Sequence, residues 1–551
     1  MEKEYIVVLY RHEDLEEFYK EMEANGFRLC MKRPISRNTH YWMTDDQAEE
    51  LKKDPRVWDV EDNNAYEVRP CGYVNNTPYT RSGDFGKDIT IAPDVDQFQW
   101  GTLHCAGTEG QRRKGVWGSD GTELVNDTVT IFNDGKHVDV VIVDDPMSYD
   151  CEEWKSPSTG LTRFVQYQWF NELNGYVASI DDDNQTLPTG TITYYQNSNN
   201  PTYHGVHVAG TAAGKHYGWA REANIYNIAV TDYWYSGQIV GQSLIFDYLR
   251  AFHRTKPINP LTGKKNPTIT NHSYASGFSL DSPLSISDVW AVDYRNTLYS
   301  MSNPGPSGGW TAATLTRDFG IPFGISFFPL VRASVINDVQ DAIREGVVVI
   351  GAAGNDNLMI DKTDGPDYYN AIHTANGYRL NYNQGSAPNG PVYGGITVGA
   401  QDYTTNFKRA NFSNYGPGVD IFAPGQKILS VYNWTGILDT KYGSPNYYQS
   451  ISGTSMASPQ VCGVIACVAS GKDRFTQEDA VQFLKQYGIK DDMTFDVSGG
   501  GFDDSTCGKG SPNLYLHIKN PRPTLGNIDT VPKSSRTNKV VYPRRSTLFT
   551  T

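Results

Sequence analysis

The chain has 551 residues with 38% hydrophobic, 20% charged and 12% aromatic residues, a composition that excludes a disordered chain and a coiled coil and suggests about three to four folded units. Its 48 basic and 62 acidic side chains give a net charge of −14, which excludes nucleic acid as the main ligand because a phosphate backbone would be repelled. The 7 cysteines show no paired spacing, so they predict neither a disulfide framework nor a zinc site, and a reducing compartment fits best.

The chain shows no signal for export or membrane insertion. Its apolar runs are shorter than the roughly 18 residues that a membrane span needs. The apolar run at residues 5–10 is flanked by charges and is too short for a secretory signal. We therefore expect no membrane partner, and a location in the cytoplasm or within an intracellular or viral assembly.

Residues 1–70 read as a small unit of their own. A strand at 5–10 is followed by a helix whose residues Leu15, Phe18 and Met22 recur at helical spacing, and Gly26 ends it. A second helix at 45–54 stops before Pro55, and a short strand follows. The order βαββαβ predicts an α+β, ferredoxin-like domain.

The remainder of the chain changes character twice. Residues 71–137 are rich in Gly, Asp and Thr without a period, which predicts a linker and surface loops. From 138 to 520, continuous Val/Ile runs alternate with helices expected near 239–253 and 334–345. Such runs predict a mainly parallel central sheet flanked by helices, the α/β class, with its active site at the carboxyl ends of the strands.

Three segments interrupt or follow this alternation. Residues 277–329 and 358–391 are rich in Gly, Pro, Asn, Ser and Tyr, and we interpret both as surface insertions. Residues 521–551 carry several Lys and Arg but a single acid, Asp529. This composition predicts an extended basic tail that contacts another body, such as a protein assembly.

Residues 453–459, GTSMASP, contain a candidate nucleophile, because Ser455 opens an apolar helix there. Backbone N–H groups at a helix start have no intrahelical acceptor, and they suit an oxyanion formed when a hydroxyl attacks a carbonyl. A serine hydroxyl needs an imidazole to take its proton. The segment at 204–214, HGVHVAGTAAG, offers His204 and His207. We expect His204 to react and His207 to pack within the helix.

A carboxylate is also required, to orient the histidine and stabilise the imidazolium. The apolar run 138–143 leads into Asp144 and Asp145, and a carboxylate at the end of a buried strand needs a partner. We favour Asp144 as the partner of His204. Asp145 remains the alternative, because only strand register separates the two residues.

The chain resembles the subtilisin-like serine protease (subtilase) family. The similarity lies in VDVVIVDD, HGVHVAGTAAG, NHSYASG, VVVIGAAGN, NFSNYGPGVDIFAPG and SGTSMASP, in the family's order. It implies Asp144 as the orienting carboxylate, His204 as the base and then the acid, Ser455 as the nucleophile and Asn355 as an oxyanion donor. It further implies that a substrate cleft is lined by Ser273, Tyr274, Ala275, Gly351, Ala352, Ala353 and Gly354.

The first unit is similar to the propeptide, or peptidase-inhibitor, domain of that family. The resemblance implies a zymogen whose own prodomain inhibits it, with self-cleavage after Glu61 and before the core. Two departures from the family pattern stand out: Asp145–Pro146 replaces the usual Ser or Thr and Gly, and Tyr274–Ala275 replaces Leu–Gly on the cleft wall. An added methyl there narrows the space for a substrate backbone.

The sequence thus predicts a serine endopeptidase that acts on polypeptides without a cofactor in its chemistry. Asp181, Asp182, Asp183 and Asn184 offer clustered oxygens for structural calcium, although a solvated acidic turn is the simpler interpretation. An alternative function is a structural or assembly component, for example of a virus particle, that uses an inhibited or degenerate protease fold as a binding body. The missing signal peptide, the insertions and the basic tail motivate that alternative.

Overall fold

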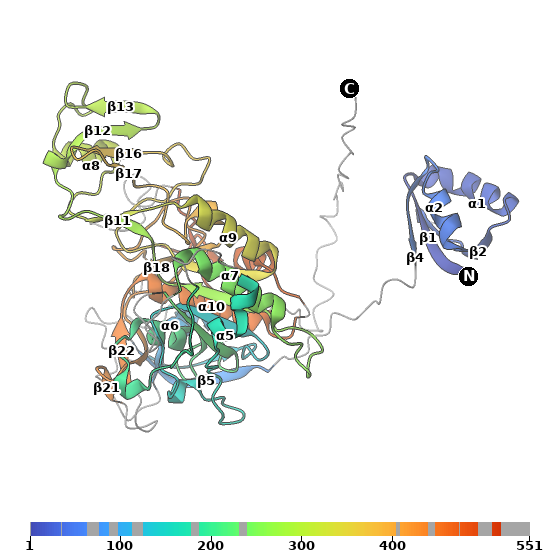
Figure 1. The fold of residues 1–551 in the computed structure, drawn as a ribbon, viewed down its shortest axis with the longest axis horizontal. Helices are drawn as coiled ribbons and strands as arrows, with labels where there is room; N and C mark the ends of the chain where they lie inside the picture. The colour runs from blue at the N-terminus through green and yellow to red at the C-terminus, as the bar shows by residue number, and fades with distance from the viewer. Residues whose placement is uncertain are drawn as a thin grey trace. The chain divides into compact units, whose positions relative to one another are not determined.

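The computed structural model describes residues 2–34, 36–62, 77–86, 97–112, 125–177, 187–230, 240–403, 408–438, 447–472, 474–493 and 510–518. The chain divides into two compact units, Met1–Gly72 and Tyr73–Thr551 (Figure 1). Three predictions fall outside the described residues: the calcium site at 181–184, the basic tail at 521–551, and most of the segment after Glu61 that would be cleaved.

The first unit is a four-stranded antiparallel sheet with two helices. Its elements are β1 (Lys3–Leu9), α1 (Leu15–Ala24), β2 (Arg28–Met31), β3 (Asn38–Met43), α2 (Asp45–Leu51) and β4 (Val57–Asp62). The sheet order β2-β3-β1-β4 is that of a split βαβ arrangement. Helix α1 buries the stripe that the sequence predicted, including Leu15, Phe18 and Met22, against the sheet. The α+β fold follows from that stripe.

The second unit is built on an eight-stranded sheet. Its order is β23-β24-β19-β18-β15-β10-β8-β9, parallel except for the edge pair β23 and β24. The strands are β8 (Asp139–Asp144), β9 (Asn224–Ala229), β10 (Thr268–His272), β15 (Val347–Ala352), β18 (Ile396–Gln401), β19 (Ile421–Pro424), β23 (Ile489–Lys490) and β24 (Leu514–Tyr515). The predicted α/β class with a mainly parallel sheet is confirmed.

Every residue of β8, β10, β15 and β18 is buried. Because successive strand residues point to opposite faces, both faces of the sheet must be covered. The covering helices are α5 (Trp169–Val177), α6 (His204–Ala213), α7 (Gln242–Thr255), α9 (Ala333–Arg344), α10 (Thr454–Ala469) and α11 (Gln477–Tyr487). Helix α10 is buried almost all round, as its apolar sequence requires.

A three-stranded sheet, β20 (Ile428–Tyr432), β22 (Tyr447–Ile451) and β21 (Ile437–Leu438), lies beside helix α6. Strand β22 ends four residues before Ser455. The sheet is held to the helix by the Ser430 hydroxyl, which donates to His207 O at 3.0 Å. This sheet therefore contacts α6 through β20 and leads along the chain, through β22, to the start of α10.

The prediction of linker and surface loops at 71–137 is wrong for the described part of that region. Strands β5 (Tyr79–Gly86), β6 (Gln97–Gln99) and β7 (Val125–Ile131) form a sheet, and α3 (Trp100–Ala106) and α4 (Glu109–Arg112) follow β6. Trp100 and Ile131 belong to the main core. The signal was weak because β7 buries only part of one face, so polar residues interrupt its sequence.

The two insertions fold together. Strand β12 (Val289–Tyr294) from the first insertion pairs with β16 (Ala371–Thr374) from the second, within the sheet β13-β12-β16-β17. The sheet includes β13 (Thr297–Ser300) and β17 (Arg379–Asn381), and helix α8 (Ala312–Phe319) contributes Leu315 and Phe319 to the same core. A short pair, β11 (Gly277–Ser279) and β14 (Phe327–Pro329), lies near its base (Figure 1). The insertions thus form one module with its own hydrophobic core.

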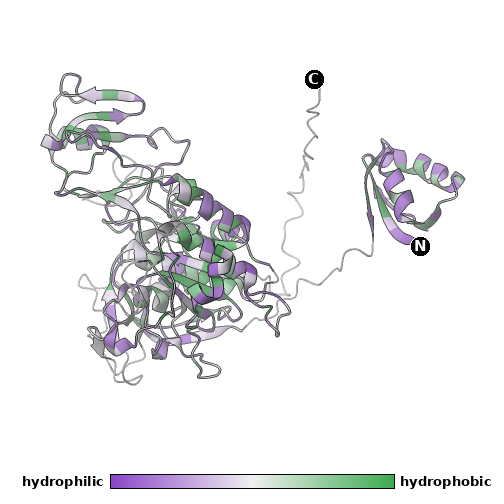
Figure 2. Cartoon of the chain, viewed as in Figure 1, coloured by the Kyte–Doolittle hydropathy of each residue, from purple (hydrophilic) through white to green (hydrophobic). Residues whose placement is uncertain are grey.

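Hydrophobic residues concentrate in the middle of the second unit, around the sheet and α10, whereas the outward helix faces are hydrophilic (Figure 2). Among the described residues, no helix has the length and apolar character needed to cross a membrane.

Candidate active site

Strand β8 brings a carboxylate to the carboxyl end of the sheet. Its last residue, Asp144, is 3% exposed. Oδ1 of Asp144 accepts hydrogen bonds from His204 Nδ1 at 2.6 Å and from the Asp145 N–H at 2.8 Å. Oδ2 is buried and has no hydrogen-bond partner among the described residues. A buried carboxylate bonded directly to the imidazole stabilises a positive charge on His204.

His204 is the first residue of α6, and its side chain is 29% exposed. The next residue is glycine for a steric reason: a Cβ on Gly205 would lie 2.6 Å from Asp145 O. The missing side chain lets the helix start approach the turn after β8. Burial disfavours the imidazolium, but the carboxylates of Asp144 and then Asp145 outweigh it and raise the pKa of His204 above its ordinary 6.5.

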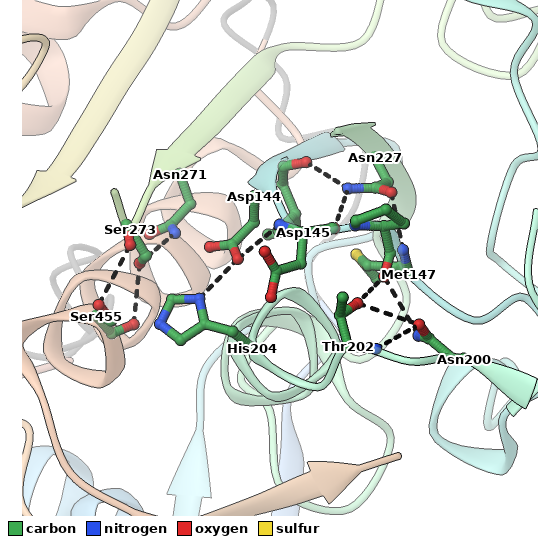
Figure 3. A network of polar contacts seen from close by, with 12 residues as sticks. Asp144, Asp145, Met147, Asn200, Thr202, His204, Asn227, Asn271, Ser273 and Ser455 are labelled. Atoms are coloured by element: carbon green, nitrogen blue, oxygen red, sulfur yellow. Dashed lines mark hydrogen bonds and ion pairs between the residues drawn. The ribbon is translucent and has the colours of Figure 1, made fainter. Parts of the chain in front are cut away.

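Ser455 lies in the first turn of α10, and the His204 ring lies between it and Asp144 (Figure 3). In this structure the Ser455 hydroxyl donates to Ser273 O at 3.2 Å, while the Ser273 hydroxyl donates to Ser455 O at 2.9 Å. Asn271 donates to Ser273 Oγ at 2.9 Å and accepts from the Ser458 hydroxyl at 2.7 Å. The helix start is therefore held against the end of β10 by side chains on both.

Two nitrogens that can donate hydrogen bonds lie near Gly453, the residue that precedes helix α10. Asn355 Oδ1 accepts from the Thr454 N–H and from the Thr454 hydroxyl, both at 2.8 Å. The amide nitrogen of Asn355 must consequently face away from Thr454. A Cβ placed on Gly453 would lie 3.6 Å from both Asn355 Nδ2 and Ser455 N. Gly453 thus leaves open a position beside two donors, where a developing oxyanion could be stabilised.

The residues predicted to line the cleft are brought together by the pairing of β10 with β15, in which His272 lies opposite Gly351. Ala275 is exposed, and Tyr274 and Gly354 are partly exposed. The others are buried: Ser273, Gly351, Ala352 and Ala353. Gly351 faces the protein interior, since a Cβ there would lie 1.9 Å from Asn389 Oδ1.

The structure distinguishes His204 from His207 and Asp144 from Asp145. His207 is fully buried, and its Nε2 lies 3.0 Å from Ile428 O and 3.1 Å from Gln449 O. Burial lowers the pKa of His207 to about 3, so it stays neutral and joins α6 to the neighbouring strands. His204 Nδ1 donates its hydrogen bond to Asp144, while Asp145 contributes its charge nearby.

Sequence reasoning missed the residues that hold the turn after Asp144. Asn227 on β9 accepts from the Met147 N–H at 3.0 Å and donates to Asp145 O at 3.2 Å. Asn200 and Thr202 both donate to Pro146 O. These contacts stabilise a turn whose Asp–Pro sequence departs from the family pattern (Figure 3). The sequence signal for this role was Asn227, a polar residue within the apolar run at 224–229, because a buried amide needs hydrogen-bond partners.

A second set of residues that the sequence did not reveal holds Tyr274 in place by hydrogen bonds. The Thr270 hydroxyl donates to Val348 O at 3.0 Å, so His272 Nε2 at 2.9 Å must be the donor to Thr270 Oγ1. His272 Nδ1 then accepts from the Tyr274 hydroxyl at 3.2 Å. Burial lowers the pKa of His272 to about 3, which keeps this chain of bonds neutral. From the second insertion, Asn389 donates to Tyr274 O at 2.7 Å.

The described residues contain one group with metal-like geometry. Ligand atoms of Asp144, Asp145 and His204 lie within 4.8 Å of one another. His204 and Asp144 already bond to each other at 2.6 Å, so the group is accounted for by a histidine and the carboxylate that orients it.

Comparison with curated proteins finds similarity to several proteases at low sequence identity. Alkaline protease 1 of Aspergillus flavus is 28% identical over 318 residues, covering 58% of this chain and 52% of that protein. Alkaline protease 1 of Emericella nidulans is 31% identical over 261 residues, covering 47% and 41%. The chain therefore spans about half the length of the curated relatives it matches.

Among solved structures, a cold adapted subtilisin-like serine proteinase aligns with 70% of this chain and 91% of its own, at 22% identity and a TM-score of 0.40. The sequence profile of the subtilase family matches residues 8–491, a span that includes Asp144, His204, Asn355 and Ser455. The chain belongs to the subtilase family.

Proposed function

We propose that the chain is a serine endopeptidase that hydrolyses peptide bonds through an acyl-enzyme on Ser455. In this proposal His204 is the general base and acid, Asp144 orients it, and Asn355 donates to the oxyanion together with the Ser455 N–H. The observation that carries the proposal is the 2.6 Å bond between His204 Nδ1 and the buried Asp144, with the ring placed beside Ser455 (Figure 3).

The reaction needs one local rearrangement. The Ser455 hydroxyl would exchange its 3.2 Å bond to Ser273 O for one to His204 Nε2, since catalytic bonds are often loose without substrate. Its oxygen attacks the peptide carbon while its proton passes to His204, and the imidazolium returns that proton to the departing amine. Water then attacks the acyl carbon while His204 takes its proton. His204 returns that proton to Ser455 Oγ as the ester bond breaks, which releases the acid.

The substrate would be an extended polypeptide. Ser273, Tyr274 and Ala275 follow directly from strand β10, and Ala275 is exposed, so a substrate strand can pair with this segment by β-augmentation. The support of Tyr274 by His272 and Asn389 would keep that segment rigid. The names of the relatives, which describe proteases, support polypeptide substrates and give no support to a purely structural role.

We also propose that the first unit is an inhibitory prodomain that the enzyme removes from itself. Its βαββαβ order and its resemblance to subtilase propeptides support this. The proposal gives a direct test of catalysis: express the full chain and Ser455→Ala, then compare intact masses and N-termini.

In this experiment the wild type should lose roughly its first 70 residues, while Ser455→Ala stays intact. On an added protein substrate the same variant should lose activity by about 10⁶-fold, the scale seen when a triad serine is removed. A cooperative thermal melt of Ser455→Ala would show that the variant is folded. Two uncleaved chains and no hydrolysis of added protein would refute the endopeptidase.

A further inference from the structure

An aromatic pair stands beside the catalytic histidine, and nothing in the mechanism uses it. Tyr203 directly precedes His204, and its ring stacks on Tyr432 with centroids 4.5 Å apart and an interplanar angle of 26°. The Tyr203 side chain is 42% exposed. A large aromatic ring that remains this exposed next to reacting groups is available to a ligand.

The pair is held in place on both sides. Tyr432 ends β20 and lies opposite Tyr447 on β22, the strand that leads to Ser455. The next residue, Asn433, is 2% exposed and donates to Asn200 O at 3.4 Å. Its Oδ1 accepts from the Thr435 N–H at 3.1 Å, which closes the turn. The ring of Tyr432 therefore sits on a constrained turn.

Tyr203 is constrained from the other direction. Thr202 donates through its N–H to Asn200 Oδ1 at 3.0 Å and through its hydroxyl to Pro146 O at 2.9 Å (Figure 3). The Tyr203 carbonyl accepts the His207 N–H at 3.0 Å, the first turn of α6. Asn200 thus connects the loops that carry both rings. A preformed aromatic surface binds a ligand with little loss of conformational freedom.

The chemistry of the proposed site indicates which half of a substrate would meet this pair. The acyl half stays on Ser455, where the segment 273–275 pairs with it. The departing amine receives its proton from His204, so the leaving half begins at the His204 ring. Tyr203 is the residue adjoining His204 on its N-terminal side.

We infer that Tyr203 and Tyr432 form a binding site for an aromatic side chain in the leaving half of the substrate, within the first residues after the cleaved bond. This inference rests on the proposed function and adds a preference to it. An aromatic side chain can stack on the exposed Tyr203 ring.

Acyl transfer to added amines isolates this site from the acyl half. The full chain is allowed to process itself and is given succinyl-Ala-Ala-Pro-Phe methyl ester, which loses methanol to form the acyl-enzyme. An amino-acid amide then competes with water: its nitrogen bonds to the acyl carbon, the ester bond to Ser455 Oγ breaks, and the amine proton returns through His204 to that oxygen. The ratio of amide product to acid measures binding of the leaving half.

The wild type should prefer phenylalaninamide to glycinamide as the acceptor. Tyr203→Ala should lower that preference by about two- to tenfold, the range expected for one aromatic contact, while methyl ester hydrolysis stays unchanged. Tyr203→Phe should keep the preference because it retains the ring. Tyr176→Ala, which removes a 69% exposed tyrosine on α5, should also keep it and serves as the matched control.

The outcomes separate the two proposals. Ester hydrolysis with equal acceptor preference in the wild type and Tyr203→Ala overturns the aromatic site and leaves the endopeptidase standing. Ester hydrolysis lost in Tyr203→Ala but kept in Tyr203→Phe would mean that the ring supports His204, which also overturns the inference. No ester hydrolysis by the wild type refutes the proposed function, and the inference with it.

Discussion

Strand β8 begins and ends with a buried aspartate, and the two ends are built differently. At the start, Asp139 accepts from Asn224 and Asn266 through Oδ1 and from Lys256 Nζ at 2.8 Å through Oδ2. At the other end, Asp144 Oδ1 is bonded to His204 and to a backbone N–H, while Oδ2 is buried without a partner among the described residues.

The difference shows how burial can be used for stability or for chemistry. The side chains of Lys256 and Asp139 are 5% and 4% exposed, and Lys256 also donates to Thr268 Oγ1 at 2.6 Å. Both carboxylate oxygens of Asp139 accept hydrogen bonds, and its negative charge is paired with Lys256. Asp144 is bonded instead to a histidine that is 29% exposed, so its charge stabilises His204 when the ring takes up a proton.

The largest expected effect on activity is at Asp144, the carboxyl end of strand β8. Asp144→Asn keeps the size of the side chain but removes the charge and permits the wrong histidine tautomer, so kcat should fall by about 10⁴-fold. Steady-state hydrolysis of a peptide substrate measures it, with a thermal melt as the control for folding. A loss below tenfold would show that Asp144 is structural, like Asp139.

The Asp139 end of the strand should respond in stability instead. Lys256→Met leaves the Asp139 carboxylate buried without its cation, which should cost about 3–5 kcal/mol of unfolding free energy. Denaturant unfolding of the processed chain measures this. The double variant Lys256→Met/Asp139→Asn should recover part of the loss because no unpaired charge remains. Unchanged stability together with lost kcat would reverse the assignment of the two ends.

Asn355 tests the donor beside Ser455. Its replacement in Asn355→Ala removes the side-chain amide, and kcat should fall by about 10²–10³-fold, or about 3–4 kcal/mol, as for the corresponding donor in subtilisin itself. KM should change little, because the oxyanion exists only after attack. A rise in KM with constant kcat would place Asn355 in ground-state binding.

The smallest effect concerns pH. Only neutral His204 can act as base, so activity should disappear as pH falls through its pKa, which the two carboxylates raise above 6.5. The acid limb of kcat/KM should therefore have its midpoint above 6.5. Asp145→Asn should move the midpoint down without abolishing activity, because Asp145 acts by charge while Asp144 also bonds. An unmoved midpoint would remove Asp145 from the electrostatics of the site.

The sequence predicted the second unit well where burial imposes a simple pattern. Strands covered on both faces appear as unbroken Val/Ile runs, so β8 and β15 were found within a residue or two. Strands with one polar face, such as β7, lack that signal, and the composition of the region around them predicts loops instead. The pairing of β12 with β16 joins residues far apart in the chain, and local composition carries no information about such partners.

The sequence by itself determined the family, the parallel sheet and the identity of Asp144, His204 and Ser455 as candidates, because a nucleophile, a base and a carboxylate need particular residue types in particular local settings. Only the tertiary structure decided which aspartate bonds to His204, how Asn227, Asn200 and Thr202 hold the turn, and that Tyr203 stacks on Tyr432. Those outcomes depend on strand register and on contacts between distant segments, where a shift of one residue sends a side chain to the opposite face.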